Sequence, residues 1–437
     1  MIPPGLILTY YGDDFTGPTD VMEALAGEGL ETVLFLDVPT SGQLARFPNA
    51  RAVGVAGESR SKSPEWMSAN LPRIFGGLKR LGAPLCHYKV CSTFDSTAQV
   101  GSIGRAIDEG RSAFGGTWTP VVVGVPLLKR YVVFGNLFAA GGDGIHRIDR
   151  HPTMSRHPST PMDEGDLLLH LARQTARSIA LFDILDLRAS DSDSRFREML
   201  GRDPDVVLFD GLDDASLAAA GRLIWRHRGE PQFVVGSSGV EYALLSWWRA
   251  KGVLPAPVEF PNVGRVDRIV AVSGSCSPVT ASQIRWAGAN GFGIIALNVD
   301  APDDVDAIEG AMTFLEAGRS VVLHTALGPD DPGLRRAMTP ESNERLGARL
   351  GGILRELIAG SGVRRAVVCG GDTSARAGRQ LGIHALTMRK PLAPGSPLCR
   401  AWADDPVFDG LEIAFKGGQV GGEDFFGLVQ NGGAKRT

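Results

Sequence analysis

The sequence predicts an α/β protein built from two α/β domains with largely parallel sheets. Short apolar runs alternate with longer helical patterns along most of the chain, as is typical of strands and helices around a parallel sheet. The 437 residues exceed the size that one hydrophobic core usually serves. The segment Lys251–Asn262 has three prolines and no periodic pattern, which indicates a linker. We therefore expect domains at residues 1–255 and 265–437.

The expected elements of the first domain follow one another without internal repeats. The expected strands are Thr32–Leu36, Arg51–Ala56, Leu85–Val90, Pro120–Gly124, Ser178–Leu185, Asp205–Phe209 and Gln232–Val235, with helices at Glu65–Arg80, Met162–Arg177 and Leu212–Arg228. After the linker, the alternation restarts with a strand at Arg268–Val272. The pattern therefore predicts one sheet on each side of the linker.

Composition narrows the classes of partner. The chain has 45 basic and 49 acidic residues and a formal charge of -4, so we expect neither a nucleic acid nor a membrane as partner. Its five cysteines are dispersed and odd in number, which favours a reducing compartment. Without a basic leader or a long apolar run, the sequence predicts a cytoplasmic protein that binds small molecules. Whether it forms a homodimer is left open.

Two adjacent carboxylates follow the first apolar run. Asp13 and Asp14 stand where that strand ends, just before a helix that begins near Pro18. Adjacent residues of an extended chain point apart, so we expect the two acids to have different partners. One would accept a proton or bind a polyol, while the other would anchor the loop. Alternatively, both acids serve the helix start, with Thr16 or Thr19 as the N-cap.

Three glycine-rich turns follow strands of the second domain. They are Gly274–Ser277, Gly370–Ser374 and Lys416–Gly418. Glycine lets the backbone approach an anion closely, and the free N–H groups of a helix start bind phosphate. Because the carboxyl ends of parallel strands gather at one edge, three such turns favour one shared anion. Each could also be an ordinary strand–helix turn, and none has the Walker or dinucleotide spacing, so the nucleotide stays unnamed.

Two polar segments of the first domain are further candidates. Residues His87–Thr97 crowd donors and acceptors at a strand end and could grip a polyhydroxylated ligand, or could form a solvated turn with Lys89 at the surface. Residues His146–Pro158 contain three histidines and several arginines. Their intervals and prolines do not predict a metal site, so we expect a basic flexible loop.

These motifs, in this order, resemble the four-carbon acid sugar kinase family. The resemblance rests on Asp13–Gly17, Gly274–Ser277, Gly370–Ser374 and Lys416–Gly418, and it spans almost the whole chain. It implies that the first domain binds a sugar acid and the second binds ATP. The γ-phosphate would then pass to a substrate hydroxyl in an active-site cleft between the two domains. It also implies Mg²⁺, which bridges and neutralises phosphate oxygens in phosphoryl transfer.

The resemblance carries over to single residues. It places the sugar acid near Asp13, Asp14, Lys89, Ser92 and Arg130. We expect Asp14 to orient and deprotonate the attacking hydroxyl, although spacing does not decide between Asp14 and Asp13. The ATP phosphates would lie near Ser275, Ser277, Gly370, Gly371, Asp372, Thr373, Gly417 and Gly418. The magnesium ligands are not identified.

One departure from the family pattern bears on the substrate. Relatives usually have an acid before the Ser-Thr pair and an arginine two residues after it, where this chain has Cys91 and Asp95. An arginine would hold a carboxylate, whereas Asp95 accepts hydrogen bonds from hydroxyls. We therefore expect a branched or oxidised acid sugar, such as a 3-oxo-tetronate or 3-oxo-isoapionate, over a linear tetronate. Arg147 or Arg150, and with more support Arg130, would bind the carboxylate.

Two other classes of function fit parts of the sequence. A phosphatase could use Asp13 and Asp14, although aspartyl-phosphate hydrolases separate their acids by one residue and these are adjacent. A sensor could bind sugar acid and nucleotide without turnover. An assay of ADP release separates all three.

Overall fold

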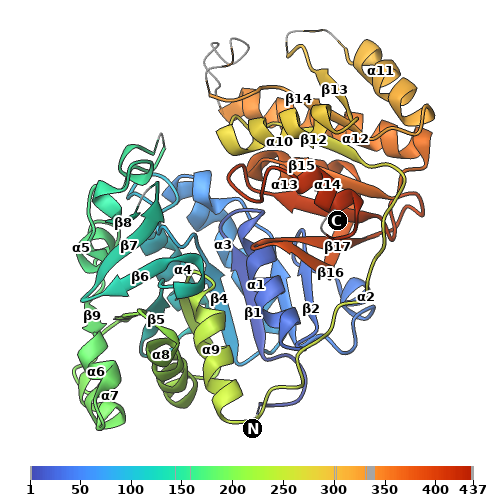
Figure 1. Ribbon diagram of the computed structural model, residues 1–437. Helices are drawn as coiled ribbons and strands as arrows, with labels where there is room; N and C mark the ends of the chain where they lie inside the picture. The colour runs from blue at the N-terminus through green and yellow to red at the C-terminus, as the bar shows by residue number, and fades with distance from the viewer. Residues whose placement is uncertain are drawn as a thin grey trace. The chain divides into compact units, whose positions relative to one another are not determined.

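The computed structural model describes residues 2–142, 144–157, 159–299, 301, 303–329, 331 and 340–434, without the side chains of residues 340–344 and 372. The chain forms two compact units. The N-terminal unit comprises Met1–Thr32 and Val38–Val258, and the C-terminal unit comprises Val33–Asp37 and Glu259–Thr437. Each unit has strands and helices of its own (Figure 1). The α/β class predicted from the sequence is confirmed.

A parallel sheet forms the centre of the N-terminal unit. Its strands lie in the order β3–β1–β4–β11–β5–β10–β9, and every pairing that joins them is parallel. Their bounds are β1 Leu8–Gly12, β3 Ala52–Val55, β4 Leu85–Lys89, β5 Thr119–Val122, β9 Ile179–Phe182, β10 Val206–Phe209 and β11 Gln232–Gly236. The central strands are buried along their whole length, because helices cover both faces of a parallel sheet.

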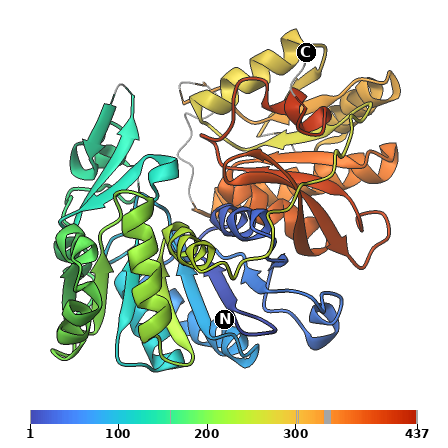
Figure 2. The ribbon, with the colours of Figure 1, turned by 60° about the horizontal axis from the view of Figure 1, so that its bottom comes forward.

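Helices cover both faces of this sheet. The main ones are α1 Gly17–Gly27, α3 Pro64–Arg80, α4 Ile103–Phe114, α8 Asp214–His227 and α9 Gly239–Ala250. Helices α3 and α4 pack together on one face, while α1, α8 and α9 pack on the other (Figures 1 and 2). Helix α3 begins where the Ser63 hydroxyl accepts from Trp66 N, and it buries Met67, Leu71 and Phe75 at helical spacing.

Two predicted elements of this unit are too long. The strand expected at Ser178–Leu185 ends at Phe182, because the Asp183 carboxylate caps helix α6, Ile184–Arg188. The helix expected at Met162–Arg177 is only α5, Leu167–Ala172, capped by Asp166. Before this helix, Gly165 O accepts a hydrogen bond from Leu137 N at 2.9 Å, so the chain there bonds to another segment. Helices α2, Ser41–Leu44, and α7, Ser192–Leu200, complete the unit.

The basic segment His146–Pro158 is not the loop that the sequence predicted. Strand β8, Gly144–Arg147, pairs antiparallel with β7, Asn136–Gly141, which pairs with β6, Arg130–Val133, in a second small sheet. Single 3-10 turns follow at Ile148–Arg150 and Met154–Arg156. Strand pairing and short turns thus give this segment a defined path, while Pro158 itself lies outside the described residues.

The C-terminal unit has a mixed sheet in the order β13–β14–β12–β15–β18–β17–β16–β2. The bounds are β12 Val270–Ser273, β13 Gly293–Ala296, β14 Val321–His324, β15 Arg365–Cys369, β16 Ile383–Ala393, β17 Ser396–Ala403, β18 Glu412–Lys416 and β2 Thr32–Phe35. The pairings from β13 to β18 are parallel, and those of β17, β16 and β2 are antiparallel. Val33–Phe35, from the N-terminal part of the chain, pairs with Ala385–Thr387.

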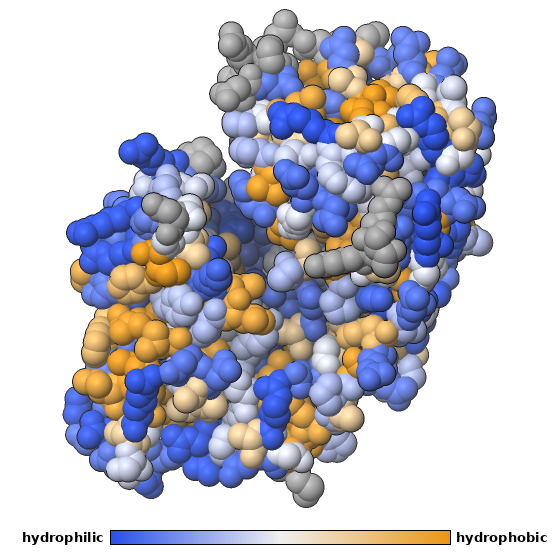
Figure 3. All heavy atoms as spheres, in the orientation of Figure 1, coloured by the Kyte–Doolittle hydropathy of each residue, from blue (hydrophilic) through white to orange (hydrophobic). Residues whose placement is uncertain are grey.

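Helices pack in two groups around this sheet. Helix α10, Pro278–Ala289, packs with α14, Phe425–Gln430, while α12, Pro340–Ser361, packs with α11, Val305–Glu316, and α13, Gly371–Gln380. Among the described residues, no helix is long and apolar enough to cross a membrane. The face drawn in Figure 3 is mainly hydrophilic, with smaller hydrophobic areas between.

Candidate active site

The predicted acidic loop lies where two adjacent strands of the N-terminal unit end. Strand β1 leads into Asp13 and Asp14, and its neighbour β4 ends at Lys89, so the two loops lie side by side. Asp13 N donates to Lys89 O at 2.8 Å. Helix α1 then leaves toward one face of the sheet and α4 toward the other. Ligands of open α/β sheets bind at such a switch point, outside the carboxyl ends of the strands.

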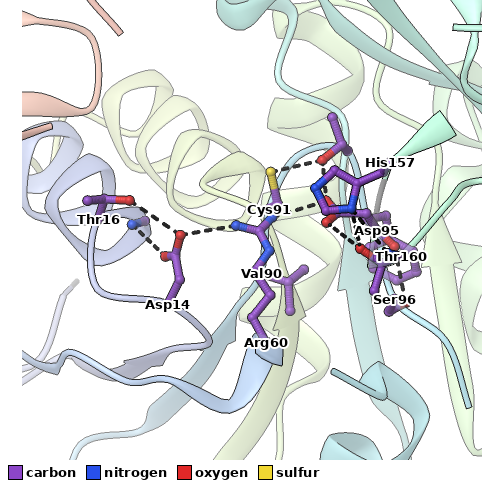
Figure 4. A network of polar contacts seen from close by, with 12 residues as sticks. Asp14, Thr16, Arg60, Val90, Cys91, Asp95, Ser96, His157 and Thr160 are labelled. Carbon is purple, nitrogen blue, oxygen red and sulfur yellow. Dashed lines mark hydrogen bonds and ion pairs between the residues drawn. The ribbon is translucent and has the colours of Figure 1, made fainter. Parts of the chain in front are cut away.

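Asp14 is held by three protein groups (Figure 4). Its carboxylate accepts from Gly17 N at 2.7 Å, from Thr16 Oγ1 at 3.3 Å and from Arg60 Nη1 at 3.0 Å. The Gly17 contact satisfies an N–H at the start of α1, as the capping alternative expected of both acids, but here it is made by Asp14, and the Thr16 side chain makes no cap. The third contact joins Asp14 to a cation that the sequence analysis did not single out.

Arg60 joins two of the predicted acids. Its Nη1 contacts Asp14 and its Nη2 contacts Asp95 Oδ1, both at 3.0 Å, and its side chain keeps 26% of its surface exposed. Burial alone would lower the pKa of Arg60, but the neighbouring Cys91, Asp95, Asp13 and Asp14 raise it well above its usual value. Arg60 follows β3, so an inspection of every strand end would have found it.

Asp13 is the most perturbed acid of the loop. It is buried, and within the described residues no side chain donates a hydrogen bond to its carboxylate. Burial raises its pKa from 3.8 to about 7; Asp14 and Asp95 add to this shift, while Arg60 and Lys89 oppose it. A carboxyl group that titrates near neutral pH is suited to general-base catalysis.

Asp95 lies in a dense network of hydrogen bonds. Besides Arg60, it accepts from Thr93 Oγ1 at 2.5 Å and from Thr160 Oγ1 at 3.1 Å. Burial raises its pKa, but Arg60 and Thr93 outweigh this effect, so the pKa lies below its usual value. Thr160 also contacts His157 Nδ1 at 2.9 Å, which connects the segment after β8 to this network (Figure 4). Both Asp95 oxygens therefore have protein partners.

The other predicted residues of this unit differ in their surroundings. Lys89 is buried rather than at the surface, and its Nζ donates to Val90 O at 3.0 Å. Ser92 is partly exposed beside it in the chain. Arg130 donates to Leu128 O at 3.1 Å, and burial lowers its pKa while nearby Cys91 raises it. Arg147 is bound to Asp149 through two hydrogen bonds, at 2.7 and 2.6 Å, which weakens its case as the carboxylate ligand.

The three glycine turns of the C-terminal unit converge. Gly274, Gly370 and Gly418 follow β12, β15 and β18, which are adjacent in the sheet. A Cβ atom on Gly274 would lie 2.3 Å from Thr373 Oγ1, and one on Gly418 would lie 2.7 Å from Ser275 Oγ. The turns therefore touch one another. Helices α10 and α13 leave β12 and β15 toward opposite faces, so this meeting point is also a switch point.

Free backbone groups and hydroxyls line this meeting point. The Ser277 hydroxyl accepts from Val279 N at 3.2 Å and caps α10, with Pro278 at its first turn. Gly370 has a φ of +114°, which allows the chain to turn sharply into α13, whose first residue is Gly371. The Asp372 side chain lies outside the described part of the structure. Among the side chains that the structure describes, none caps the helix start at Gly371, and uncapped N–H groups of a helix start can bind an anion.

The side chains of Lys416 and Gln283 hold the terminal glycine turn in place through hydrogen bonds. The Lys416 side chain is fully buried, and its Nζ donates to Thr280 Oγ1 at 3.0 Å and to Gly417 O at 3.1 Å. Burial lowers the pKa of Lys416, and Cys369 partly offsets this. Gln283 Nε2 donates to the carbonyls of Val420, Gly421 and Gly422. These hydrogen bonds thus fix the backbone of the turn that contains Gly417 and Gly418.

Within the described residues, no group of three or more His, Cys, Asp or Glu side chains is placed to hold a metal. Mg²⁺ in kinases is bound mainly by substrate phosphates and water, with one or two protein carboxylates. The donor set is therefore compatible with a metal that arrives with the nucleotide.

Comparison with known proteins supports the division of roles between the units. Residues 8–244 match the family described as sugar-binding N-terminal domain, and residues 270–426 match the nucleotide-binding C-terminal domain. A 3-oxo-isoapionate kinase from Paraburkholderia graminis is 51% identical, over 98% of this chain and 95% of its own length. A 3-oxo-tetronate kinase from Methylobacterium radiotolerans is 32% identical, over 97% of this chain and 98% of its own length. A crystal structure of a protein from Salmonella typhimurium LT2 matches with a TM-score of 0.77 at 25% identity. The match covers 97% of this chain and 98% of that protein's chain.

The chain belongs to the four-carbon acid sugar kinase family, as the order of its motifs indicated. It is a phosphotransferase that acts on a hydroxyl group and uses ATP. The particular acid sugar that it phosphorylates and the roles of single residues are proposed below.

Proposed function

We propose that this kinase transfers the γ-phosphate of ATP to a hydroxyl of a branched, oxidised acid sugar of the 3-oxo-isoapionate type. The 51% identity to a 3-oxo-isoapionate kinase supports this substrate over 3-oxo-tetronate, whose kinase shares 32%. The observation that carries the mechanism is Arg60, a partly exposed cation fixed between two carboxylates beside the buried Asp13. Arg60 can hold an anionic substrate, and Asp13 can accept the proton of its hydroxyl group.

Arg60 is our candidate for binding the substrate carboxylate. Its bonds to Asp14 and Asp95 use one N–H on each terminal nitrogen, while a guanidinium has five N–H donors in a rigid fork. The remaining donors can form charge-assisted bonds to a carboxylate. Arg60 would thus provide the positive charge that relatives have at the position of Asp95. Arg130, Lys89 and Ser92 remain candidates for binding the substrate oxygens.

Asp13 is our candidate for the general base, in place of Asp14. A base that works at neutral pH needs a pKa near 7 and a free oxygen, and Asp13 combines both. Asp14 already accepts three hydrogen bonds, which suits a positioning role better than proton transfer. In this scheme Asp13 removes the hydroxyl proton while Asp14 and Arg60 keep the acid sugar oriented.

The ATP phosphates would lie against the converging turns that carry Ser275, Ser277, Gly370, Gly371, Gly417 and Gly418. Close contact between these turns leaves small side chains and backbone N–H groups as the surface for an anion. Mg²⁺ would neutralise charge on the β- and γ-phosphates when it is bound with them. The domain limits 1–255 and 265–437 and the cytoplasmic location stay part of this proposal, while the question of a homodimer stays open.

A coupled assay of ADP release tests the proposal. Purified protein is given ATP and Mg²⁺ with 3-oxo-isoapionate, a 3-oxo-tetronate or a linear tetronate. We expect the largest kcat/KM for 3-oxo-isoapionate. A preference for a linear tetronate would contradict the proposed substrate. ATP-independent phosphate release from a sugar phosphate would favour the phosphatase alternative, and ligand binding without turnover would favour the sensor.

A further inference from the structure

Three arginines line a cavity in the C-terminal unit that the proposed function does not use. The cavity has a volume of about 160 Å³ and is lined by Arg364, Arg389, Arg400, Gly410 and Glu412. Arg364 precedes β15, whereas Arg389, Arg400 and Glu412 belong to β16, β17 and β18. We call these five residues the arginine pocket. Three neighbouring strands and a loop therefore bring together basic side chains that are distant in sequence.

The arginine pocket lies near the amino ends of strands β15 and β18, whereas the glycine turns follow their carboxyl ends. Arg365 and Glu412 are the first residues of β15 and β18, while Gly370 and Gly417 follow their last residues. Five residues of a parallel strand span roughly 13–17 Å at about 3.3 Å per residue. A ligand in the arginine pocket therefore cannot contact phosphates bound at the glycine turns.

Protein contacts fix two of the three guanidinium groups. Arg364 donates to the carbonyls of Val407, at 2.6 Å, and Asp409, at 2.5 Å. Arg400 Nη2 donates to Asp409 Oδ2 at 3.1 Å, and its guanidinium stacks on the ring of Trp402 at 4.2 Å. These bonds use one N–H each of Arg364 Nη1, Arg364 Nη2 and Arg400 Nη2, so both guanidinium groups keep further N–H donors. The pocket is thus preorganised before any ligand binds.

The acids around the pocket do not balance its arginines. Glu412 bonds to the buried Arg365 at 2.5 and 2.8 Å, and its contact with Arg389 is a longer ion pair of 3.8 Å. The three arginines of the pocket and the buried Arg365, which lies outside it, thus share two carboxylates, Asp409 and Glu412. Arg400 Nε is buried with no hydrogen-bond partner among the described residues. Unmatched donors and excess positive charge favour an anionic ligand.

Gly410 keeps the space between two of the arginines open. Its φ is +73°, and an added Cβ would lie 3.5 Å from both Arg364 Nη2 and Arg400 Nη1. Two guanidinium groups therefore face the same small volume, where their mutual repulsion is relieved by a shared anion. A side chain at this position would fill that volume.

We propose that the arginine pocket binds a compact dianionic oxyanion, either inorganic phosphate or a small phosphate monoester. Planar guanidinium groups bind phosphate oxygens through paired, charge-assisted hydrogen bonds, and three converging forks match a tetrahedral anion better than a planar carboxylate. The site is separate from the glycine turns, so the same enzyme would bind phosphate groups at both edges of the sheet.

Isothermal titration with inorganic phosphate tests the site. The titration is done at constant ionic strength on protein saturated with ADP and Mg²⁺, so that the proposed nucleotide site is filled. We expect saturable binding whose Kd rises by about 5–50-fold in Arg389→Gln and Arg400→Gln, as for the loss of one charge-assisted contact. The exposed Arg202 follows α7 in the other unit and is ion-paired with Glu198. It supplies the control Arg202→Gln, which should bind as wild type.

Two outcomes would overturn the proposal: no saturable phosphate binding by the wild type, or equal binding by wild type and Arg389→Gln. Within the described part of the chain, the Arg389 side chain makes one long ion pair, with Glu412, so its substitution should leave the fold intact even if Arg400→Gln does not fold. A parallel titration with glycerol 3-phosphate distinguishes the source of the anion. Tighter binding of the monoester assigns the site to phosphorylated metabolites, and tighter binding of phosphate assigns it to the inorganic ion.

Discussion

The two units offer their strand ends to ligands in different chemical forms. The N-terminal unit presents charged side chains, with Asp13, Asp14 and Lys89 on adjacent loops and Arg60 joining two acids. The C-terminal unit presents glycines, hydroxyls and a helix start, and Lys416, at the end of β18, is buried. Backbone N–H groups can bind the phosphates common to every nucleotide, whereas side chains can distinguish one acid sugar from another.

The comparison predicts that substitutions in the N-terminal unit change turnover and substrate choice, while those in the glycine turns change nucleotide affinity. Variants of the two sites should therefore separate kcat and sugar specificity from ATP binding.

The largest effect is expected for Asp13→Asn, which keeps the shape but removes the proton acceptor. We expect kcat to fall about 10²–10⁴-fold with ATP affinity unchanged, as is typical for loss of a general base. In the wild type, kcat/KM should rise as pH increases through about 7, where Asp13 loses its proton. Asp20→Asn, in the first turn of α1, is the matched control. If Asp14→Asn is inactive and Asp13→Asn is not, the two roles must be exchanged.

Arg60→Gln should come next. Loss of a charge-assisted contact to the substrate, with Asp14 and Asp95 left without their cation, should lower kcat/KM for the acid sugar about 30–1000-fold. Binding of ADP, measured by titration calorimetry, should not change. Arg105→Gln, at a 43% exposed arginine of α4, serves as control. An Arg60 variant that loses ADP binding instead would break the proposed separation.

Asp95→Ala tests which side of the network sets specificity, with an expected loss of roughly 10–100-fold in kcat/KM. If Asp95 only positions Arg60, oxidised and linear substrates should lose activity equally. If Asp95 contacts a substrate hydroxyl, the branched substrate should lose more, as we expected from the sequence. Steady-state kinetics with both substrates decide between these roles, and an unchanged kcat/KM for both would exclude Asp95 from substrate selection.

Gly274→Ala should weaken nucleotide binding by about tenfold. The added methyl group would meet Thr373 Oγ1 at 2.3 Å and must displace it from the meeting point of the turns. Fluorescence or calorimetric titration with ADP measures the change, while kinetics at saturating ATP should retain sugar specificity. Gly352→Ala, in α12 with open space around it, is the control. Equal ADP affinity in both variants would remove this turn from the nucleotide site.

The smallest effect concerns stability. The folded-state pKa of Asp13, about 7, lies above its ordinary 3.8, so the folded protein binds this proton more tightly. The resulting stabilisation is present below about pH 4 and is lost as pH rises through 7. Asp13→Asn should therefore raise Tm relative to wild type by a few degrees at pH 8 and by less at pH 5. Thermal unfolding at both pH values checks this, and a larger gain at pH 5 would contradict the sign.

Local patterns fixed much of what could be predicted. A strand followed by glycine and small hydroxyl residues specifies its turn within a few residues, so Gly274–Ser277 and Gly370–Ser374 are predictable without tertiary contacts. Ser277 caps its helix, whereas α13 has no side-chain cap among the side chains that the structure describes. The strands that end before these turns also have continuous apolar runs that reveal them. The two elements predicted too long are wrong at their ends, where Asp183 and Gly165 make hydrogen bonds that the hydrophobic pattern does not encode.

The sequence by itself determined the α/β class, the acidic loop, the glycine turns and the family, because each depends on neighbouring residues in a fixed order. Only the tertiary structure decided that Arg60 joins Asp14 to Asp95, that Val33–Phe35 pairs with β16, and that Arg364, Arg389 and Arg400 line one pocket. These contacts connect residues up to several hundred positions apart. Strand order and register bring these residues together, and neither can be read from the spacing of residues along the sequence.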